Sequence, residues 1–438
     1  MLQILGRIAA ISGCAAAACG GDATPEGEFE SCETWQEFPQ VTQQQIDVLV
    51  AVDTSLPGTV RHQAALAIGE ALTRELGRDD VHVAVVSGDL GVGEAELSGC
   101  SERGDAARLL GDACTHGGEP FFFRTAREDG TVEANYGDLG EALSCALPEE
   151  SGCEIQQPLE ATARALEEEP AGFRRQGAYL SVVFVAGSDD CSSRDLGLLL
   201  GDDPALGPTG AFRCAELGLS CDGERPKAEP AIYDTCEPLA DSEVLAPLDD
   251  YLERLIQQVA AEPLLYDVGV VAGNPEPLEV TVDSETGAAE FVSTCGSSSV
   301  GTDPPIRLHA IAAPWRPNNT AAICNPERAG ELIRPPPAFG AQLCLSPDID
   351  PADIAPEEPG IQLDCYAAEI AVASDEERPL PMCALTTRGE LAPESPQPCW
   401  RVEETPACAD VGNGLTVVVE RHANPARAAN LVLRCSCA

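Results

Sequence analysis

The chain has 438 residues, of which 44% are hydrophobic and only 4% aromatic, so a sizeable core would be built from aliphatic side chains. Its formal net charge of −47 opposes nucleic acid binding, since little here would neutralise phosphates, and it opposes docking on anionic lipid headgroups. The same charge suits a soluble surface that attracts cations or cationic partners. Twenty scattered cysteines without a C-x-x-C pair, and only five histidines, argue against zinc sites and indicate disulfides formed in an oxidising compartment.

The N-terminus resembles a bacterial lipoprotein signal. MLQILGRIAAISGCAAAACGGD has one positive charge, a short apolar segment and small residues before cysteine. We predict a signal peptide over residues 1–18 and lipidation at Cys19, with Cys14 as the alternative. Cleavage before Cys19 leaves 18 of the 20 cysteines beyond the lipidated one (20 − 2), an even number that can pair, whereas cleavage before Cys14 leaves 19. An uncleaved or ordinary secretory signal is the remaining alternative, and no later run of about 18 apolar residues predicts a membrane-spanning helix.

The next part of the chain is predicted as a tether followed by alternating strands and helices. Residues 19–43 are polar, acidic and without periodicity, which is typical of a flexible tether. Residues 46–52 form a continuous apolar run, the pattern of a strand buried on both faces, and residues 82–86 repeat it. Between them, residues 60–76 have apolar side chains on one helical face. Residues 95–135 are irregular and contain cysteines, so we expect an insertion there.

The middle of the chain continues this alternation. Residues 137–147 and 158–169 are predicted helices, and residues 180–186 are a third buried strand. An insertion rich in glycine, proline and cysteine follows over residues 196–240, and an amphipathic helix lies within residues 243–262.

The order of these elements predicts the fold class. A fourth buried strand lies within residues 264–274. Strands that alternate with helices in this way specify a Rossmann-like α/β domain, an open and mostly parallel sheet with helices on both faces, which we expect over residues 44–340. Residues 341–438 are dense in proline and cysteine and contain short β-like runs such as LTVVVER and NLVLRC. We predict a small disulfide-rich β appendage there.

Candidate metal ligands follow two of the predicted strands. Asp53 and Ser55 come directly after the first strand, and Asp189 and Asp190 follow the third. Ser151, in a middle loop, offers a further hydroxyl. Open α/β sheets bind ligands at the carboxyl ends of their strands, and hard cations such as Mg²⁺ or Ca²⁺ take oxygen ligands of these kinds.

Together with the element order, Asp53-Thr54-Ser55 resembles the start of a von Willebrand factor type A domain. The resemblance implies an Asp-x-Ser-x-Ser motif, a middle-loop hydroxyl and a later aspartate around a divalent cation that captures a partner's carboxylate. Here Pro57 replaces the second serine, and Gly187 stands where the later aspartate would be. We therefore expect a degenerate site with no resident cofactor, or weak binding of Mg²⁺ or Ca²⁺. Asp53 and Ser55 would then cap the next helix or satisfy strand-end amides, and a displaced site using Asp189 or Asp190 is the alternative.

A narrower resemblance concerns the cysteine-rich segments. SCALPEESGCEIQQPLEA and VVFVAGSDDCS resemble parts of cysteine-rich bacterial lipoproteins that contain this domain, of the kind found in myxobacteria-like genomes. Short loops between expected neighbours suggest three disulfides: Cys145 with Cys153, Cys324 with Cys344 and Cys399 with Cys408. Cys191 is expected to pair within the second insertion, with Cys214, Cys221 or Cys236.

Enzymatic motifs are missing from the sequence. There is no G-x-S-x-G, no P-loop and no G-x-G-x-x-G after a strand, so we predict that the protein is not an enzyme. His82 and His309 lie in apolar runs and are expected to be packed strand residues, while His62 is placed on a helix near the strand-end face. The expected function is a lipid-anchored binding or adhesion module of the cell envelope, with a protein or cell-surface ligand. The alternatives are a structural envelope lipoprotein without a ligand site and, less favoured, a cryptic hydrolase.

Overall fold

The computed structural model describes two compact units, which we call the larger unit (Val41–Ala338) and the terminal unit (Met1–Gln40 with Phe339–Ala438). The predicted signal peptide, with Cys14 and Cys19, lies outside the described residues. Within the part of the chain that is described, no helix is long and apolar enough to cross a membrane. The described residues are 33–40, 45–75, 80–97, 99–126, 131–148, 152–168, 172–175, 178–201, 203, 206–258, 266–296, 300–313, 319–333, 343–371, 377–409, 413–421 and 429–436.

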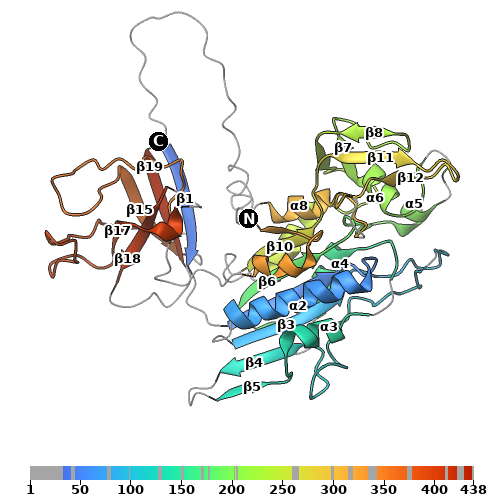
Figure 1. The fold of residues 1–438 in the computed structure, drawn as a ribbon, viewed down its shortest axis with the longest axis horizontal. Helices are drawn as coiled ribbons and strands as arrows, with labels where there is room; N and C mark the ends of the chain where they lie inside the picture. The colour runs from blue at the N-terminus through green and yellow to red at the C-terminus, as the bar shows by residue number, and fades with distance from the viewer. Residues whose placement is uncertain are drawn as a thin grey trace, which may run out of the picture. The chain divides into compact units, whose positions relative to one another are not determined.

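The larger unit is built on one seven-stranded sheet, which confirms the predicted α/β class (Figure 1). Its strands in chain order are β2 (Gln45–Val52), β3 (Asp80–Ser87), β4 (Phe122–Ala126), β5 (Val132–Ala134), β6 (Tyr179–Val185), β10 (Tyr266–Ala272) and β13 (Thr320–Ala322). They lie in the order β13-β10-β6-β2-β3-β4-β5. The five strands from β13 to β3 are parallel, and β4 and β5 extend the sheet antiparallel at one edge.

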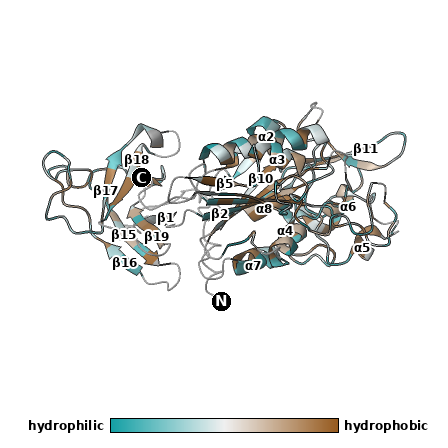
Figure 2. Cartoon of the chain, turned by 90° about the horizontal axis from the view of Figure 1, so that it is seen from below, coloured by the Kyte–Doolittle hydropathy of each residue, from teal (hydrophilic) through white to brown (hydrophobic). Residues whose placement is uncertain are grey.

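Helices cover both faces of this sheet. α2 (Gly58–Glu75) and α3 (Leu139–Cys145) lie on one face, and α4 (Pro158–Glu167) and α7 (Leu248–Gln258) lie on the other (Figure 2). The short helix α8 (Ile306–Ala312) packs its buried leucine and isoleucine into the same core as α4 and α7. This sandwich explains the continuous apolar runs of the central strands, because residues on both faces of each strand are buried.

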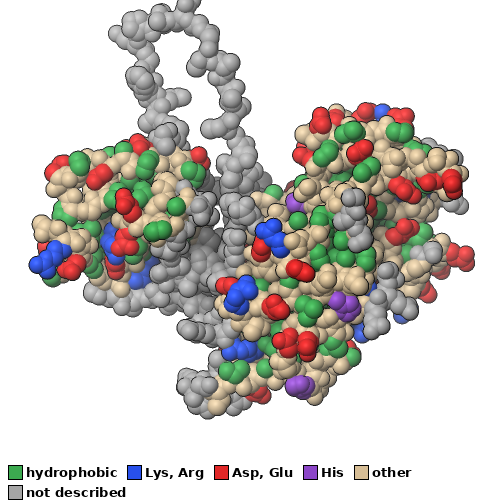
Figure 3. Space-filling model, in the orientation of Figure 1, with side chains coloured by type: hydrophobic (Ala, Val, Ile, Leu, Met, Phe, Trp, Pro, Cys, Tyr) green, Lys and Arg blue, Asp and Glu red, His purple; other side chains and the backbone are tan. Residues whose placement is uncertain are grey.

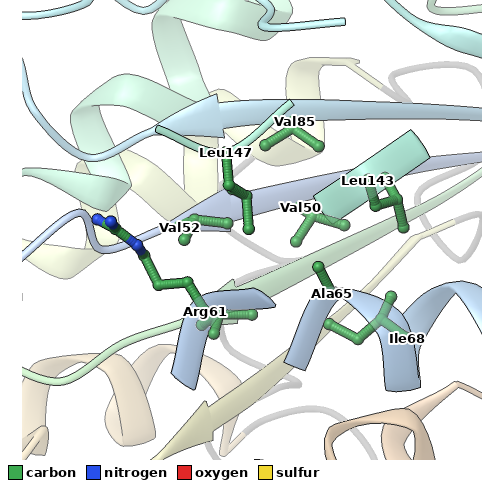
Figure 4. A pocket seen from close by; sticks show the side chains of 9 residues that line it. Val50, Val52, Arg61, Ala65, Ile68, Val85, Leu143 and Leu147 are labelled. Atoms are coloured by element: carbon green, nitrogen blue, oxygen red, sulfur yellow. The ribbon is translucent and has the colours of Figure 1, made fainter. Parts of the chain in front are cut away.

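Alternate side chains of β2 serve the two faces. Leu49 and Ala51 belong to the core shared with α4, α7 and α8. Val50 and Val52 point to the other face, where they line a small apolar space between the sheet and α2 together with Ala65 and Leu143 (Figure 4). The 3₁₀ helix η1 (Pro326–Leu332) also packs against α2 on this side, close enough that a Cβ on its Gly330 would meet the α2 backbone at 2.4 Å.

The strand order reverses at β2. From β2 the chain crosses by α2 to β3 on one side, and it later returns to β6 on the other side before continuing to β10 by α7. Two neighbouring parallel strands whose connections leave in opposite directions open a crevice at their carboxyl ends, where open α/β sheets bind ligands. We call this region, formed by residues 53–56, 87–89, 152–157, 187–190 and 302–304, the carboxyl-end face.

The two predicted insertions contain regular structure that the sequence did not indicate. Residues 95–135 supply β4 and β5, so part of the first insertion belongs to the main sheet. The second contains α5 (Leu196–Leu200), α6 (Ala211–Gly218), β7 (Leu219–Cys221), β8 (Ala231–Tyr233) and β9 (Cys236–Pro238). β8 pairs with β11 (Leu278–Val282), which pairs with β12 (Ala289–Phe291), while β7 pairs with β9. Elements of three to eight residues are too short for a periodic apolar pattern to emerge.

The terminal unit consists of two small antiparallel sheets. One has the order β1-β19-β15-β16, from β1 (Glu33–Gln40), β15 (Cys365–Ala371), β16 (Glu377–Leu380) and β19 (Ala429–Ser436). The other has the order β14-β18-β17, from β14 (Leu343–Cys344), β17 (Cys399–Glu404) and β18 (Leu415–Glu420), with the 3₁₀ turn η2 (Pro406–Cys408). The larger unit is therefore inserted between β1 and the other strands of the terminal unit.

The tether prediction is wrong for residues 33–40, which form β1. β1 pairs with β19 along its whole length, with Glu33 opposite Ser436 and Gln40 opposite Ala429. Its buried Phe38 joins a core with Leu431 and Leu433 of β19. This strand was missed because its sequence has no continuous apolar run, and its partner lies almost 400 residues further along the chain.

All three predicted disulfide pairings are wrong, although each of the six cysteines forms a disulfide. The prediction for Cys191 is confirmed with Cys214 as its partner. The disulfides among the described residues are Cys100–Cys153, Cys114–Cys145, Cys191–Cys214, Cys221–Cys236, Cys295–Cys324, Cys344–Cys408, Cys365–Cys435 and Cys383–Cys399.

Candidate functional site

Asp53 lies at the centre of the carboxyl-end face, directly after β2. Its Oδ2 accepts hydrogen bonds from the backbone N–H of Gly187 and of Ser188, each at 2.9 Å, and from Ser188 Oγ at 3.0 Å. Its Oδ1 accepts from the N–H and the Oγ of Ser55, at 2.7 and 2.5 Å. The side chain is buried. Five donors for the roughly four lone-pair directions of a carboxylate leave this group fully occupied.

Leu56 fills the space beside Gly187. The leucine is buried, and a Cβ built on Gly187 would meet its Cδ2 at 2.5 Å and its Cγ at 2.8 Å. An aspartate at position 187 therefore has no room while Leu56 keeps this position, since cores are packed to near crystal density. The absence of a carboxylate at 187 and the presence of leucine at 56 are two parts of one packing arrangement.

Gln156 holds the turn after β2 against the loop before α4. Its Oε1 accepts from the N–H of Thr54 at 3.2 Å, and its Nε2 donates to Thr54 Oγ1 at 3.1 Å. The N–H of Gly152 donates to the Thr54 carbonyl at 2.7 Å, and a Cβ there would lie 2.2 Å from Thr54 Oγ1. The predicted ligand Ser151 precedes this glycine and lies outside the described residues. The buried guanidinium of Arg61, which also donates to the Thr54 carbonyl, has its pKa lowered by burial, against the raising effect of Asp53.

Asp189 and Asp190 form their hydrogen bonds with α8 and α4. Asp189 accepts from the backbone N–H of Arg307 at 2.9 Å and of Leu308 at 3.1 Å, so it caps the first turn of that helix. Asp190 forms a fully buried ion pair with Arg307, with an oxygen–nitrogen distance of 3.1 Å. It also accepts from the N–H of Leu159 at 3.1 Å, at the start of α4. These contacts indicate structural roles for both acids, in capping helices and pairing with Arg307, rather than a displaced metal site.

Asp303 and Glu154 add negative charge to this face. The N–H of Asp303 donates to the Gly187 carbonyl at 2.7 Å, which keeps the half-buried Asp303 beside the loop after β6. Burial, and then the negative charges of Asp53, Asp189 and Glu154, raise the pKa of the Asp303 carboxyl to about 7. Burial also raises the pKa of Asp189 to about 7, against the lowering effect of the hydrogen bond from Arg307. The face thus concentrates acidic groups, two of which hold protons near neutral pH.

The described residues contain no group of three or more His, Cys, Asp or Glu side chains arranged to hold a metal ion. Asp53 and Ser55 are hydrogen-bonded to each other, while Asp189 and Asp190 are committed to α8 and Arg307. The oxygen atoms of Asp53, Asp189 and Asp190 are therefore engaged by other groups rather than directed into a common shell. Chemically the face can attract a cationic group, and its bound protons can be exchanged with solvent near neutral pH.

Three of the five histidines form side-chain contacts within the larger unit. His82 lies in β3 as predicted and contacts the Phe173 carbonyl at 2.8 Å. His309 lies in α8, so the prediction of a strand is wrong; it contacts the Gly273 carbonyl at 3.2 Å. His62 contacts Ser144 of α3. Burial lowers the pKa of both His82 and His309, which favours the neutral imidazole.

Solved structures similar to this chain are von Willebrand factor type A and pilus-adhesin structures. The pilus adhesin SpaC from Lactobacillus rhamnosus GG is 8% identical with a TM-score of 0.28, and the match covers 94% of this chain and 42% of the adhesin. A von Willebrand factor type A structure from Catenulispora acidiphila is 9% identical with a TM-score of 0.27, covering 95% and 68%. The pilus adhesin RrgA from Streptococcus pneumoniae is 10% identical with a TM-score of 0.28, covering 92% and 58%.

The chain thus spans less than two thirds of the length of either adhesin. No family model matches the chain, and no curated protein matches it. Because the TM-scores are below 0.5, these similarities carry no argument about function, which depends below on the geometry of the face.

Several residues of this face were not singled out from the sequence. Leu56 and Gln156 lie next to predicted positions, but their packing partners come from other loops. Asp303 and Arg307 lie more than 100 residues beyond the acids with which they interact. A local pattern carries no signal for such contacts, although the run of Asp303 followed by two prolines marks a fixed loop.

Proposed function

We propose that the protein is an extracytoplasmic binding module, lipid-anchored at Cys19, that engages a cationic partner at the carboxyl-end face without a bound metal. The occupied carboxylate of Asp53 is the single observation that carries this proposal. A cation at this point would displace N–H donors of Gly187 and Ser188 and leave them buried without partners, which costs about 1–3 kcal/mol for each group. The degenerate metal site expected from the sequence is therefore part of this proposal.

The charge of the chain supports a cationic partner. Acidic side chains outnumber basic ones by 73 to 26, and Figure 3 shows red carboxylates spread over the visible surface with few blue groups among them. Asp303 and Glu154 concentrate this charge where the sheet opens. A protein or surface ligand presenting arginine or lysine side chains would meet a complementary field here, which speeds its association.

Titration calorimetry of the chain without its signal peptide tests the metal part of the proposal. We expect no saturable heat with Mg²⁺, Mn²⁺ or Ca²⁺. Asp53→Ala is the diagnostic variant, and Asp195→Ala, which removes an exposed carboxylate from the cap of α5, is its control. Saturable metal binding that is lost in the Asp53 variant and kept in the Asp195 variant would overturn the proposal that this face binds no metal.

Mass spectrometry of the mature N-terminus tests the anchor, and we expect a lipidated Cys19.

Binding of a fluorescent arginine-rich peptide tests the partner class. The double variant Asp303→Asn with Glu154→Gln should weaken binding several-fold. Glu390→Gln with Glu394→Gln removes two carboxyl groups from exposed positions in the terminal unit and should change binding little. Equal losses in both variants would show that only overall charge attracts the peptide, and the assignment of this face would be wrong.

A structural envelope lipoprotein is the second candidate. The observation in its favour is that the carboxylate oxygens of Asp53, Asp189 and Asp190 form hydrogen bonds and an ion pair within the protein, which hold the loops and α8 in place. If the unmodified protein does not bind the arginine-rich peptide, the function as a structural envelope lipoprotein would be favoured.

A further inference from the structure

The ladder between β1 and β19 is followed by a cysteine on each strand. Its last described pair is Glu33 opposite Ser436, and the next residues outward in the sequence are Cys32 and Cys437, which lie outside the described residues. We propose that Cys32 and Cys437 form a disulfide that closes this end of the ladder. The bond would join the two ends of the terminal unit covalently. This inference goes beyond the proposed binding function and does not depend on it.

The register of the ladder brings these two positions together. All eight pairs, from Glu33 with Ser436 to Gln40 with Ala429, follow one register, and continuing it by one step sets Cys32 opposite Cys437. Directly opposed residues of antiparallel strands have Cα–Cα distances of about 4.5 or 5.5 Å, depending on whether the pair is hydrogen-bonded. Disulfides usually span Cα–Cα distances of about 4.4–6.8 Å, so either kind of pair allows the bond.

A disulfide of this kind is present in the same sheet. Cys365 of β15 lies directly opposite Cys435 of β19, and the two are bonded with a Cα–Cα distance of 4.1 Å. Successive side chains of a strand alternate between the faces of a sheet. By this alternation Cys437 shares a face with the buried Cys435, and Cys32 shares one with the buried Phe38. Cys435 and Phe38 belong to one core, so both proposed partners fall on the same side of the sheet.

The other cysteines leave these two without another partner in the sequence. The eight disulfides of the described residues use 16 of the 20 cysteines, and four remain: Cys14, Cys19, Cys32 and Cys437. Cys14 falls in the predicted signal peptide, and the sulfur of Cys19 is the predicted lipidation site. Two thiols are then left, and they can satisfy each other.

Formation of this bond is a two-electron oxidation. The Cys437 thiolate attacks the disulfide of a protein disulfide donor in the oxidising compartment, which gives a mixed disulfide. The Cys32 thiolate then attacks the Cys437 sulfur, the bond between the two cysteines forms, and the donor leaves as a dithiol that carries both electrons and the two thiol protons. A donor of this class also serves the other disulfides of a protein folded in such a compartment.

The turn between β11 and β12 divides the disulfides into two sets. Four pairs lie wholly before this turn: Cys100–Cys153, Cys114–Cys145, Cys191–Cys214 and Cys221–Cys236. The other four lie wholly after it: Cys295–Cys324, Cys344–Cys408, Cys365–Cys435 and Cys383–Cys399. Among the disulfides of the described residues, none crosses the turn. The bond between Cys32 and Cys437 would therefore be the link that keeps both parts together in a chain cut there.

The test inserts a site for a specific protease in this turn, where Gly287 is exposed and a Cβ on it would meet nothing within 4 Å. The full mature chain, produced in an oxidising compartment, is cut, denatured and run on a gel without reduction. We expect the two parts to stay joined and to separate after reduction. In the double variant Cys32→Ser with Cys437→Ser they should separate without reduction. Helical circular dichroism before the cut confirms that each protein is folded.

A second cut site is the control. Gly223 is exposed in the loop closed by Cys221–Cys236, and a Cβ on it would also meet nothing within 4 Å. Parts cut there should stay joined in the unmodified protein and in the double variant alike, because Cys221–Cys236 spans that cut.

Peptide mapping of the uncut, unreduced protein needs no variant. Cleavage at glutamate and arginine frees residues 31–33, which contain Cys32, and residues 435–438, which contain Cys437. We expect to recover these two peptides in one linked product, with fragmentation assigning the link to Cys437.

The proposal would be overturned if the unmodified protein, cut at Gly287, separated without reduction. Parts of the double variant that stay joined would overturn it as well, since another disulfide would then cross the turn. A free thiol at Cys32, or a dimer linked through it, would contradict the pairing directly.

Discussion

The contact between Leu56 and Gly187 gives the sharpest test of the packing at the carboxyl-end face. In Gly187→Ala the new Cβ would lie 2.5 Å from Leu56 Cδ2, and because Leu56 is buried it has little room to move. Overpacking of this kind costs about 1–3 kcal/mol of unfolding free energy. Leu56→Ala removes a buried side chain and should cost about 2–5 kcal/mol.

The double variant should cost less than the sum of the two. Without Leu56 the added methyl group at 187 enters free space, so the two changes should couple by about 1–3 kcal/mol. Urea unfolding followed by helical circular dichroism reports on the larger unit, since every α-helix of the described residues lies there. Gly137→Ala is the control, because a Cβ at that position meets nothing within 4 Å. If the costs of the two changes add to within about 0.5 kcal/mol, Leu56 does not occupy the space beside Gly187, and the explanation for the missing carboxylate fails.

Three further predictions concern the same structure. Asp190→Ala leaves the buried Arg307 guanidinium without its carboxylate partner and should lower the unfolding free energy, measured in urea, by about 3–5 kcal/mol. Asp250→Ala, which breaks an exposed ion pair, should lower it by at most about 1 kcal/mol. Similar losses in the two variants would contradict the burial of the pair between Asp190 and Arg307. Because the pKa of Asp189 and of Asp303 is raised to about 7, the folded chain holds more protons than the unfolded chain between about pH 4 and pH 7, so stability should fall as pH rises through this window. Urea midpoints should fall less steeply in Asp303→Asn, and an unchanged slope would count against the raised pKa. Replacing both cysteines of Cys100–Cys153 by serine should lower stability by about 2–4 kcal/mol, and peptide mapping of the unreduced chain should recover this pair.

The main sheet could be predicted because its strands are buried on both faces. A strand such as β2 then has an unbroken apolar run, and the helices between such runs show one apolar face. These are local properties, so they can be recognised from the sequence alone. The same holds for the position of Asp53, since the residue after a buried strand in a parallel sheet always lies at the carboxyl edge.

The remaining features depend on contacts between distant segments. β1 has no continuous apolar run in its sequence, and β19 supplies its hydrogen bonds. Asp189 was recognised as a strand-end acid, but the helix that it caps begins 117 residues later, at Ile306. The cysteine pairings failed for a related reason: loop length limits which cysteines can meet, and the packing of the elements decides which of them do.

The insertion of the larger unit after β1 also determines how this molecule would carry force. A pull applied ahead of Glu33, with the load held at the carboxyl-end face, passes along β1, through residues 41–44 and into β2, at whose end Asp53 lies. The covalent backbone of β1 carries this tension, so the eight residue pairs between β1 and β19 are not on the path of the force. β19 and the other strands of the terminal unit lie outside this covalent path, so the terminal unit can keep its fold while a load passes through β1.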